Sequence, residues 1–69
     1  MNKREYELIV APYMLRADLN KTKIAKVINM TPQAYSARTR NPDMFRRWEL
    51  GAIANYLNMS NEDRGKLID

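Results

Sequence analysis

The sequence predicts an all-α domain of five short helices. Apolar residues recur at helical spacing along most of the chain, whereas the only candidate strand, residues 6–10, does not alternate. Residue types that cap helices precede several of these periodic segments. A chain of 69 residues is long enough for one small domain, residues 1–69, and too short for two.

The first helix is expected over residues 4–17. Its inward stripe is expected to contain Leu8, Ile9, Tyr13 and Leu15. Pro12 lies inside this segment, where proline removes a backbone hydrogen bond and clashes with the preceding turn. Either the helix kinks or shifts there, which we favour, or it begins near Pro12 and residues 6–10 are extended. Leu19 lies between polar residues and is expected to pack into the core.

Two short helices are expected around a tight turn. Asn20 can cap a helix over residues 21–28, because its side chain accepts from the exposed amides of the first turn. Asn29 follows where a left-handed residue ends that helix, a conformation that Asn tolerates. Thr31 can cap the next helix, residues 32–39, whose first residue is a proline with a suitable φ.

The fourth helix is expected to begin at residue 43 or 44 and to end at residue 57. It should supply the largest share of the core, through Phe45, Trp48, Ala52, Ile53, Tyr56 and Leu57. Ser60 can cap a last short helix that reaches Ile68, with Asp63 completing an approximate capping box. Two methionines are expected to be partly exposed and available for a dimer contact, Met44 and Met59.

The net charge of +4 is unevenly distributed. Residues 1–47 contain ten Lys and Arg against four Asp and Glu, a net charge of +6, and residues 48–69 carry −2. Residues 20–40 contain no carboxylate at all. A basic part with an acidic remainder orients a protein toward polyanions, so nucleic acid is a candidate partner.

Several classes of function find no support in the composition. There is no cysteine and no histidine, which removes disulfides and thiolate or imidazole zinc sites and favours a cytoplasmic protein. No apolar run approaches the ~20 residues that span a bilayer, so no membrane partner is expected. Because a Gly-rich loop and an inward carboxylate pair are also missing, we expect no enzymatic activity, cofactor, metal or small-molecule substrate.

Residues 20–40 match the geometry of a helix-turn-helix, in which two short helices share a core and the second enters the major groove of DNA. The longer stretch from Leu19 to Ser60 resembles the Cro/repressor, or Xre-type, family of phage and mobile-element regulators. The motifs that carry this resemblance are Ile24-Ala25, Met30-Thr31, Tyr35-Ser36 and the closing helix Leu50 to Ser60. It implies a lambda-repressor-like fold and a sequence-specific, Cro-like transcriptional repressor in the cytoplasm of a bacterium or phage-infected host.

The chain departs from that family at three places. Asn29 stands where the family usually has Gly, and Lys21 stands where many members carry a phosphate-contacting Gln. Residues 40–42 replace the common Glu-Asn-Gly end of the recognition helix. These departures leave the operator sequence unassigned.

A helical wheel identifies the candidate base-reading residues. If Tyr35 points into the core, the outward face carries Gln33, Ala37 and Arg40, with Ser36 on its flank. The Gln33 amide can pair with adenine, Ala37 is small enough to admit a thymine methyl group, and Arg40 can take guanine or a phosphate. The candidate phosphate contacts are Lys21, Lys23, Thr31, Arg38, Arg46 and Arg47.

Recognition of a two-fold operator implies a weak homodimer on double-stranded DNA. The C-terminal segment from Tyr56 to Ile68, with Met59 and Leu67, is the expected dimer surface. The alternative function is a small helical protein-interaction module that binds a regulator, a polymerase or a toxin instead of DNA.

Overall fold

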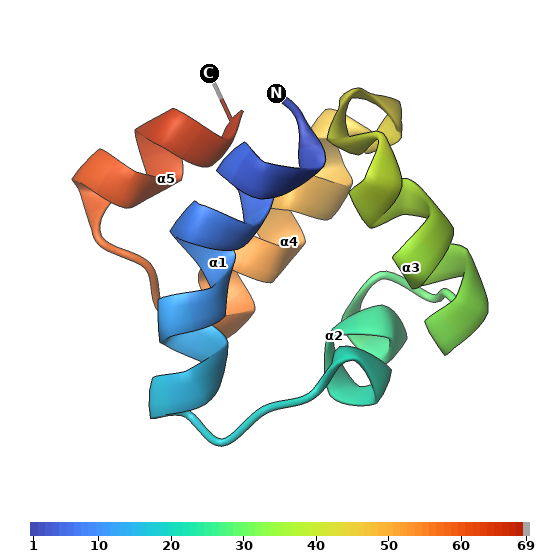
Figure 1. Cartoon of the computed structure of the whole chain (residues 1–69). Helices are drawn as coiled ribbons and strands as arrows, with labels where there is room; N and C mark the ends of the chain where they lie inside the picture. Colours follow the sequence, from blue (N-terminus) through green and yellow to red (C-terminus); the bar gives the residue numbers. More distant parts are fainter. Residues whose placement is uncertain (69) are drawn as a thin grey trace.

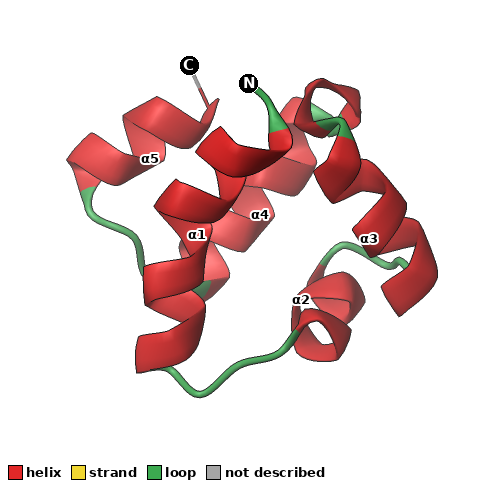
Figure 2. Ribbon diagram, in the orientation of Figure 1, coloured by secondary structure: helices red, strands yellow, loops and turns green. Residues whose placement is uncertain are grey.

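Every regular element of the structure is helical (Figure 2). The computed structural model describes residues 1–68, and these form five α-helices and one short 3-10 helix. The elements are α1 (Lys3–Arg16), α2 (Lys21–Val27), α3 (Pro32–Arg40), η1 (Pro42–Met44), α4 (Arg47–Tyr56) and α5 (Asn61–Ile68). The expected all-α, five-helix fold is therefore confirmed.

The helices pack as a small cluster (Figure 1). α1 packs on α3 and α5, α2 packs on α3 and α4, and α4 packs on α5. The core between them includes Ile24, Ala25, Ile53 and Ala54, all with no exposed surface. Because α3 rests on both α1 and α2, its orientation is set by two neighbours.

α1 begins at Lys3 with a capping box. The Asn2 side chain accepts from the Glu5 amide at 2.8 Å, and the Glu5 carboxylate accepts from the Asn2 amide at 3.2 Å. The helix continues through Pro12 to Arg16, so the alternative with residues 6–10 extended is wrong.

The inward stripe of α1 was only partly predicted. Its buried residues are Tyr6 and Val10, with Tyr13 partly buried one turn further on. Leu8 and Leu15, expected to face inward, are 67% and 85% exposed. Positions 6, 10 and 13 follow one helical face, and Leu8 and Leu15 lie away from it.

Three of the connections share one three-residue pattern. The first residue has a positive φ: 54° at Asp18, 57° at Asn29 and 53° at Asn58. The next residue is apolar, and its amide donates to the carbonyl five residues earlier, as in Met30 to Ala25 at 2.8 Å. Leu19 and Met59 make the same bond, to Met14 and Ala54. The left-handed Asn29 and the packing of Leu19 are thus confirmed, whereas Met59, expected to be partly exposed, is buried.

The third residue of each connection caps the next helix. Asn20 accepts from the Lys23 amide at 3.1 Å, Thr31 from the Ala34 amide at 3.1 Å, and Ser60 from the Asp63 amide at 3.2 Å. All three expected caps are confirmed. A single local arrangement, repeated three times, therefore ends one helix and starts the next.

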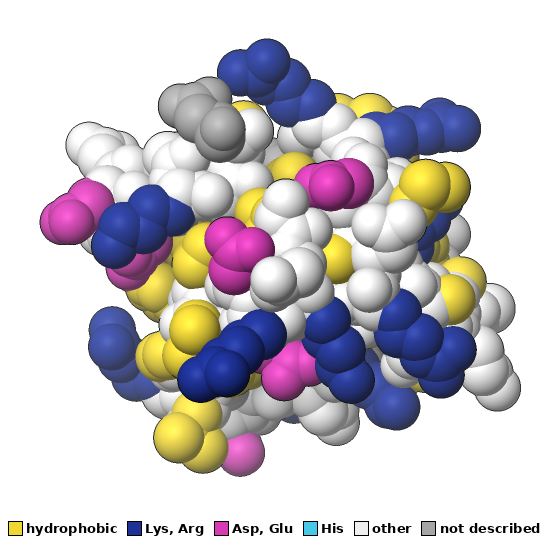
Figure 3. All heavy atoms as spheres, turned by 45° about the horizontal axis from the view of Figure 1, so that its top comes forward, with side chains coloured by type: hydrophobic (Ala, Val, Ile, Leu, Met, Phe, Trp, Pro, Cys, Tyr) yellow, Lys and Arg dark blue, Asp and Glu magenta, His cyan; other side chains and the backbone are white. Residues whose placement is uncertain are grey.

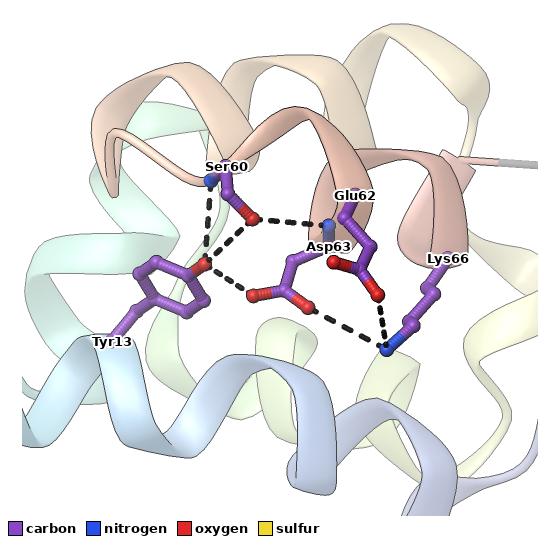
Figure 4. A network of polar contacts seen from close by, with 5 residues as sticks. All are labelled: Tyr13, Ser60, Glu62, Asp63 and Lys66. Atoms are coloured by element: carbon purple, nitrogen blue, oxygen red, sulfur yellow. Dashed lines mark hydrogen bonds and ion pairs between the residues drawn. The ribbon is translucent and has the colours of Figure 1, made fainter.

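The capping box expected at Ser60 is replaced by a contact between helices (Figure 4). The Tyr13 hydroxyl of α1 donates to the Asp63 carboxylate and accepts from the Ser60 amide at 3.3 Å. The Tyr13 hydroxyl holds the pKa of Asp63 below its ordinary 3.8. Lys66, one turn later, lies 3.8 Å from both Asp63 and Glu62. This network holds the start of α5 against α1.

α4 begins later than expected. Residues 42–44 form η1, Phe45 is extended with ψ 138°, and α4 starts only at Arg47. The extended backbone accompanies burial of the Phe45 side chain against the Tyr6 ring, with the ring centroids 5.4 Å apart. Because Phe45 packs in the core in this extended conformation, the first turn of the expected helix does not form.

Tyr6, Tyr35 and Phe45 form the aromatic centre of the core. The two tyrosine hydroxyls are hydrogen bonded to each other at 2.8 Å, and burial raises the pKa of both. Trp48 and Tyr56, expected in the core, are instead 52% and 46% exposed. The inward face of α4 consists of Glu49, Leu50, Ile53 and Ala54.

Ile53→Ala should lower the free energy of unfolding by about 2–5 kcal/mol, because it leaves a cavity in a fully buried site. Trp48→Ala, on the opposite face of the same helix, should cost about 1 kcal/mol or less. Urea unfolding of both variants measures the difference. Equal losses would mean that Trp48 is part of the core after all.

Candidate nucleic-acid interface

The inward side of α3 is fixed by Tyr35. Its ring lies in the aromatic centre and its hydroxyl is bonded to Tyr6, so the wheel that the sequence predicted for this helix is confirmed. On the other side, Gln33, Ala37 and Arg40 are exposed, and Ser36 is partly buried at the flank. The Thr31 cap and Pro32 at the first position set where this face begins.

Side chains from α2 and α3 surround one open depression. Its lining residues are Lys21, Pro32, Gln33, Ser36 and Arg40. The Lys21 ammonium group donates to Ser36 Oγ at 3.3 Å, which ties the first residue of α2 to the middle of α3. Three of the four base-reading candidates are thus brought together with one phosphate candidate. Ala37 is exposed on the same helix.

The electrostatics of this region follow from its composition. α2 and α3 carry Lys21, Lys23, Lys26, Arg38 and Arg40, and neither helix carries a carboxylate. The other α-helices each carry a carboxylate in the first turn, Glu5 in α1, Glu49 in α4, and Glu62 and Asp63 in α5. Figure 3 shows Lys and Arg side chains at separate positions around the face it draws, with Asp and Glu between some of them. The pair α2–α3 is therefore the part of the fold best suited to an anionic ligand.

Arg38 has a structural partner that the sequence did not reveal. Its Nη1 donates to Glu49 Oε1 at 2.8 Å and to the Met44 carbonyl at 3.1 Å. Glu49 is only 3% exposed and also accepts from the Arg46 amide at 2.7 Å. A buried carboxylate needs such partners, so Arg38 is part of the fold as well as a phosphate candidate. The sequence gives only a weak signal for this pairing, namely a Glu three residues after the N-cap of α4.

The remaining phosphate candidates lie in three places. Thr31 uses its hydroxyl to accept from the Ala34 amide and is exposed, as is Lys23 in α2. Arg46 and Arg47 are exposed at the start of α4. Through the contacts of Glu49, that start is held against the end of α3.

The expected dimer surface needs correction. Within residues 56–68, Met59 and Leu67 are buried in the core, because Met59 follows a left-handed residue and Leu67 lies on the inward side of α5. The segment therefore lacks most of the exposed apolar surface that the predicted dimer contact requires. Met44, expected to be partly exposed, is 62% exposed.

A larger depression lies away from the α2–α3 pair. It measures about 700 Å³, against about 540 Å³ for the depression beside α3. It lies between α1, η1 and α5, and its lining is mostly apolar, including Leu8, Ile9 and Leu50. Volume alone does not make it the better candidate for an anionic ligand.

Within residues 1–68, no group of three or more Asp or Glu side chains is placed to hold a metal ion. No helix in the described part of the chain is both long and apolar enough to cross a bilayer. No protein-family model, curated protein or solved structure matches the chain. The geometry of the chain itself therefore carries the functional argument.

Arg38→Ala should lower the free energy of unfolding by about 3–5 kcal/mol, because it leaves the Glu49 carboxylate buried without its cation. Such a loss approaches the whole stability of a domain this small. Arg40→Ala, two residues away and exposed, is the matched control and should change stability by about 0.5 kcal/mol or less. Thermal melts that coincide for the two variants would contradict this role of Glu49.

Proposed function

We propose that the chain is a sequence-specific DNA-binding transcriptional regulator, a Cro-like repressor. In this proposal α2 and α3 form a helix-turn-helix, and α3 enters the major groove of a two-fold operator. The observation that carries the proposal is the open depression in which Gln33, Ser36 and Arg40 of α3 lie beside Lys21 of α2. The proposed location is the nucleoid of a bacterium or phage-infected host cell.

The chemistry of the α3 face supports base reading. Gln33 is in the first turn of α3, the part of a recognition helix that penetrates deepest, and its amide can bond adenine N6 and N7. Ser36 can donate or accept, and Ala37 leaves room for a thymine methyl group. Arg40, at the last position of the helix, can reach guanine or a phosphate.

Two groups of cations would flank this face on the DNA backbone. The first is Lys21 and Lys23 in α2, together with the Thr31 hydroxyl at the start of α3. The second is Arg46 and Arg47 at the start of α4, where a cation opposes the dipole of its own helix. A phosphate close to that helix start offsets the unfavourable placement.

Selection of bound duplexes from a random DNA pool is the primary test. The proposal requires a reproducible two-fold site, with half-sites about one helical turn apart, and an affinity that falls steeply with salt. Enrichment of no site from the pool would overturn it.

Gln33→Ala should weaken binding to the selected site by about 1–3 kcal/mol and relax selectivity at one or two base positions. Binding to random DNA should hardly change, because the amide makes no phosphate contact in this arrangement. Asn61→Ala, an exposed amide at the start of α5, is the control. Equal losses on selected and random DNA would exclude base reading by Gln33.

Lys21→Ala and Arg46→Ala should each weaken binding to all sequences and lower the slope of log affinity against log salt by about one unit. Lys66→Ala is the matched control, since Lys66 lies on α5 beside Glu62 and Asp63. A slope that stays at the wild-type value shows that the substituted cation does not meet a phosphate.

A protein-interaction module is the second candidate function. The exposed Trp48 and Tyr56 on one side of α4 favour it, because aligned apolar side chains left exposed often mark protein contacts. Salt-insensitive binding to a protein, with no DNA site selected, would identify this alternative.

A further inference from the structure

The outer face of α4 carries an apolar stripe that residues 1–68 leave about half exposed at its two ends. Trp48, Ala52 and Tyr56 stand four residues apart, so they lie along one side of the helix. The two aromatic side chains at its ends are 52% and 46% exposed. The opposite side of α4 packs in the core on α2 and α5.

We propose that a second copy of this chain packs on this stripe, with the two α4 helices antiparallel and a two-fold axis at Ala52. This inference rests on the proposed function, because the second copy would supply the second recognition helix of an operator-bound dimer. The packing itself is argued from α4 alone.

The stripe is self-complementary under a two-fold rotation. A large residue, a small residue and a large residue follow at equal spacing, so each Trp48 meets the partner's Tyr56 while the Ala52 residues face each other at the axis. Gly51 lies beside Ala52, and a Cβ atom built there meets nothing within 4 Å. The centre of the stripe therefore has room for the close approach of a second helix.

The charges also favour a second copy at this face. A chain of net charge +4 repels its copies in general, but positions 48, 51, 52, 55 and 56 carry no charged side chain. Two copies can therefore approach along these positions without bringing like charges opposite each other.

The area indicates a weak dimer. Half-exposed Trp48 and Tyr56 offer roughly 100 Å² each, given the 150–250 Å² that a fully buried aromatic residue contributes. A stable interface buries about 800 Å² per partner, so the dimer should be weak and should form without DNA only at high protein concentration. The stripe on α4 shares no residue with the depression beside α3, which is lined by Lys21, Pro32, Gln33, Ser36 and Arg40.

Cysteine cross-linking without DNA tests the arrangement, because the chain has no cysteine of its own. Ala52→Cys places two thiols at the axis, and Leu15→Cys, 85% exposed, is the control for random collision. Under mild oxidation, Ala52→Cys should form the disulfide dimer faster by roughly tenfold or more, since the pairing raises the local thiol concentration. A smaller excess overturns the proposal.

Trp48 provides a second measurement, because it is the only tryptophan in the chain. Its emission should shift to the blue as protein concentration rises from micromolar to millimolar, as the partner covers the ring. Gly51→Glu should abolish the shift, and Gly65→Glu in α5, equally open in the structure, should preserve it. Both variants are first shown to melt cooperatively, and a shift that is missing in the wild type, or unchanged in Gly51→Glu, refutes the inference.

These measurements use no DNA, so they separate the two proposals. A dimer without a selected operator would leave the α4 pairing standing and remove the regulator. A selected operator without cross-linking at position 52 would leave the regulator and remove the pairing.

Discussion

The buried carboxylate of Glu49 is the constraint on which the arrangement of the candidate site depends. A charge with 3% exposure is tolerated only when it is paired and hydrogen bonded. The Arg46 amide bonds Glu49 within the capping box of α4, whereas the Arg38 guanidinium reaches it from α3. Sliding α3 along α4 would therefore leave the buried charge without its cation. Hydrophobic contacts tolerate small slides, whereas this geometry does not, so it fixes the outer face of α3 relative to the cations of α4.

The parts of the fold that follow from neighbouring residues could be predicted from the sequence. Asn20, Thr31 and Ser60 each cap a helix by accepting from the amide three residues later. Asn29 adopts its left-handed conformation at the end of the helix to which it is joined, so the neighbouring residues are enough to predict it. The same local chemistry operates at Asp18 and Asn58, where an Asx residue is again followed by an apolar residue and a cap, a recurrence that the sequence itself displays. Such features need no knowledge of the distant chain.

The parts that depend on distant partners could not be predicted. Phe45 leaves the expected helix because Tyr6, 39 positions earlier, supplies the ring on which it stacks. Apolar residues occur on both sides of α1 and α4, so spacing alone did not decide between Tyr6 and Leu8, or between Ile53 and Trp48. In the candidate site, a helical wheel with Tyr35 placed in the core was enough to predict the outward face of α3. The pairing of Arg38 with Glu49 required the path of the chain through η1.

The small size of the domain connects its stability to its candidate function. A chain of 69 residues has too little interior to hide all of its apolar side chains, and Leu8, Leu15, Trp48 and Tyr56 remain outside. Leu8 and Leu15 are scattered on α1, and such isolated exposure is ordinary. Trp48 and Tyr56 are aligned on one helix with small residues between them, which is the form that a partner helix fits. If α3 reads DNA as proposed, its four candidate side chains contact few base pairs, and a second copy would supply the remaining specificity. The proposed pairing of two chains would therefore both cover the exposed apolar residues of α4 and compensate for the shortness of α3.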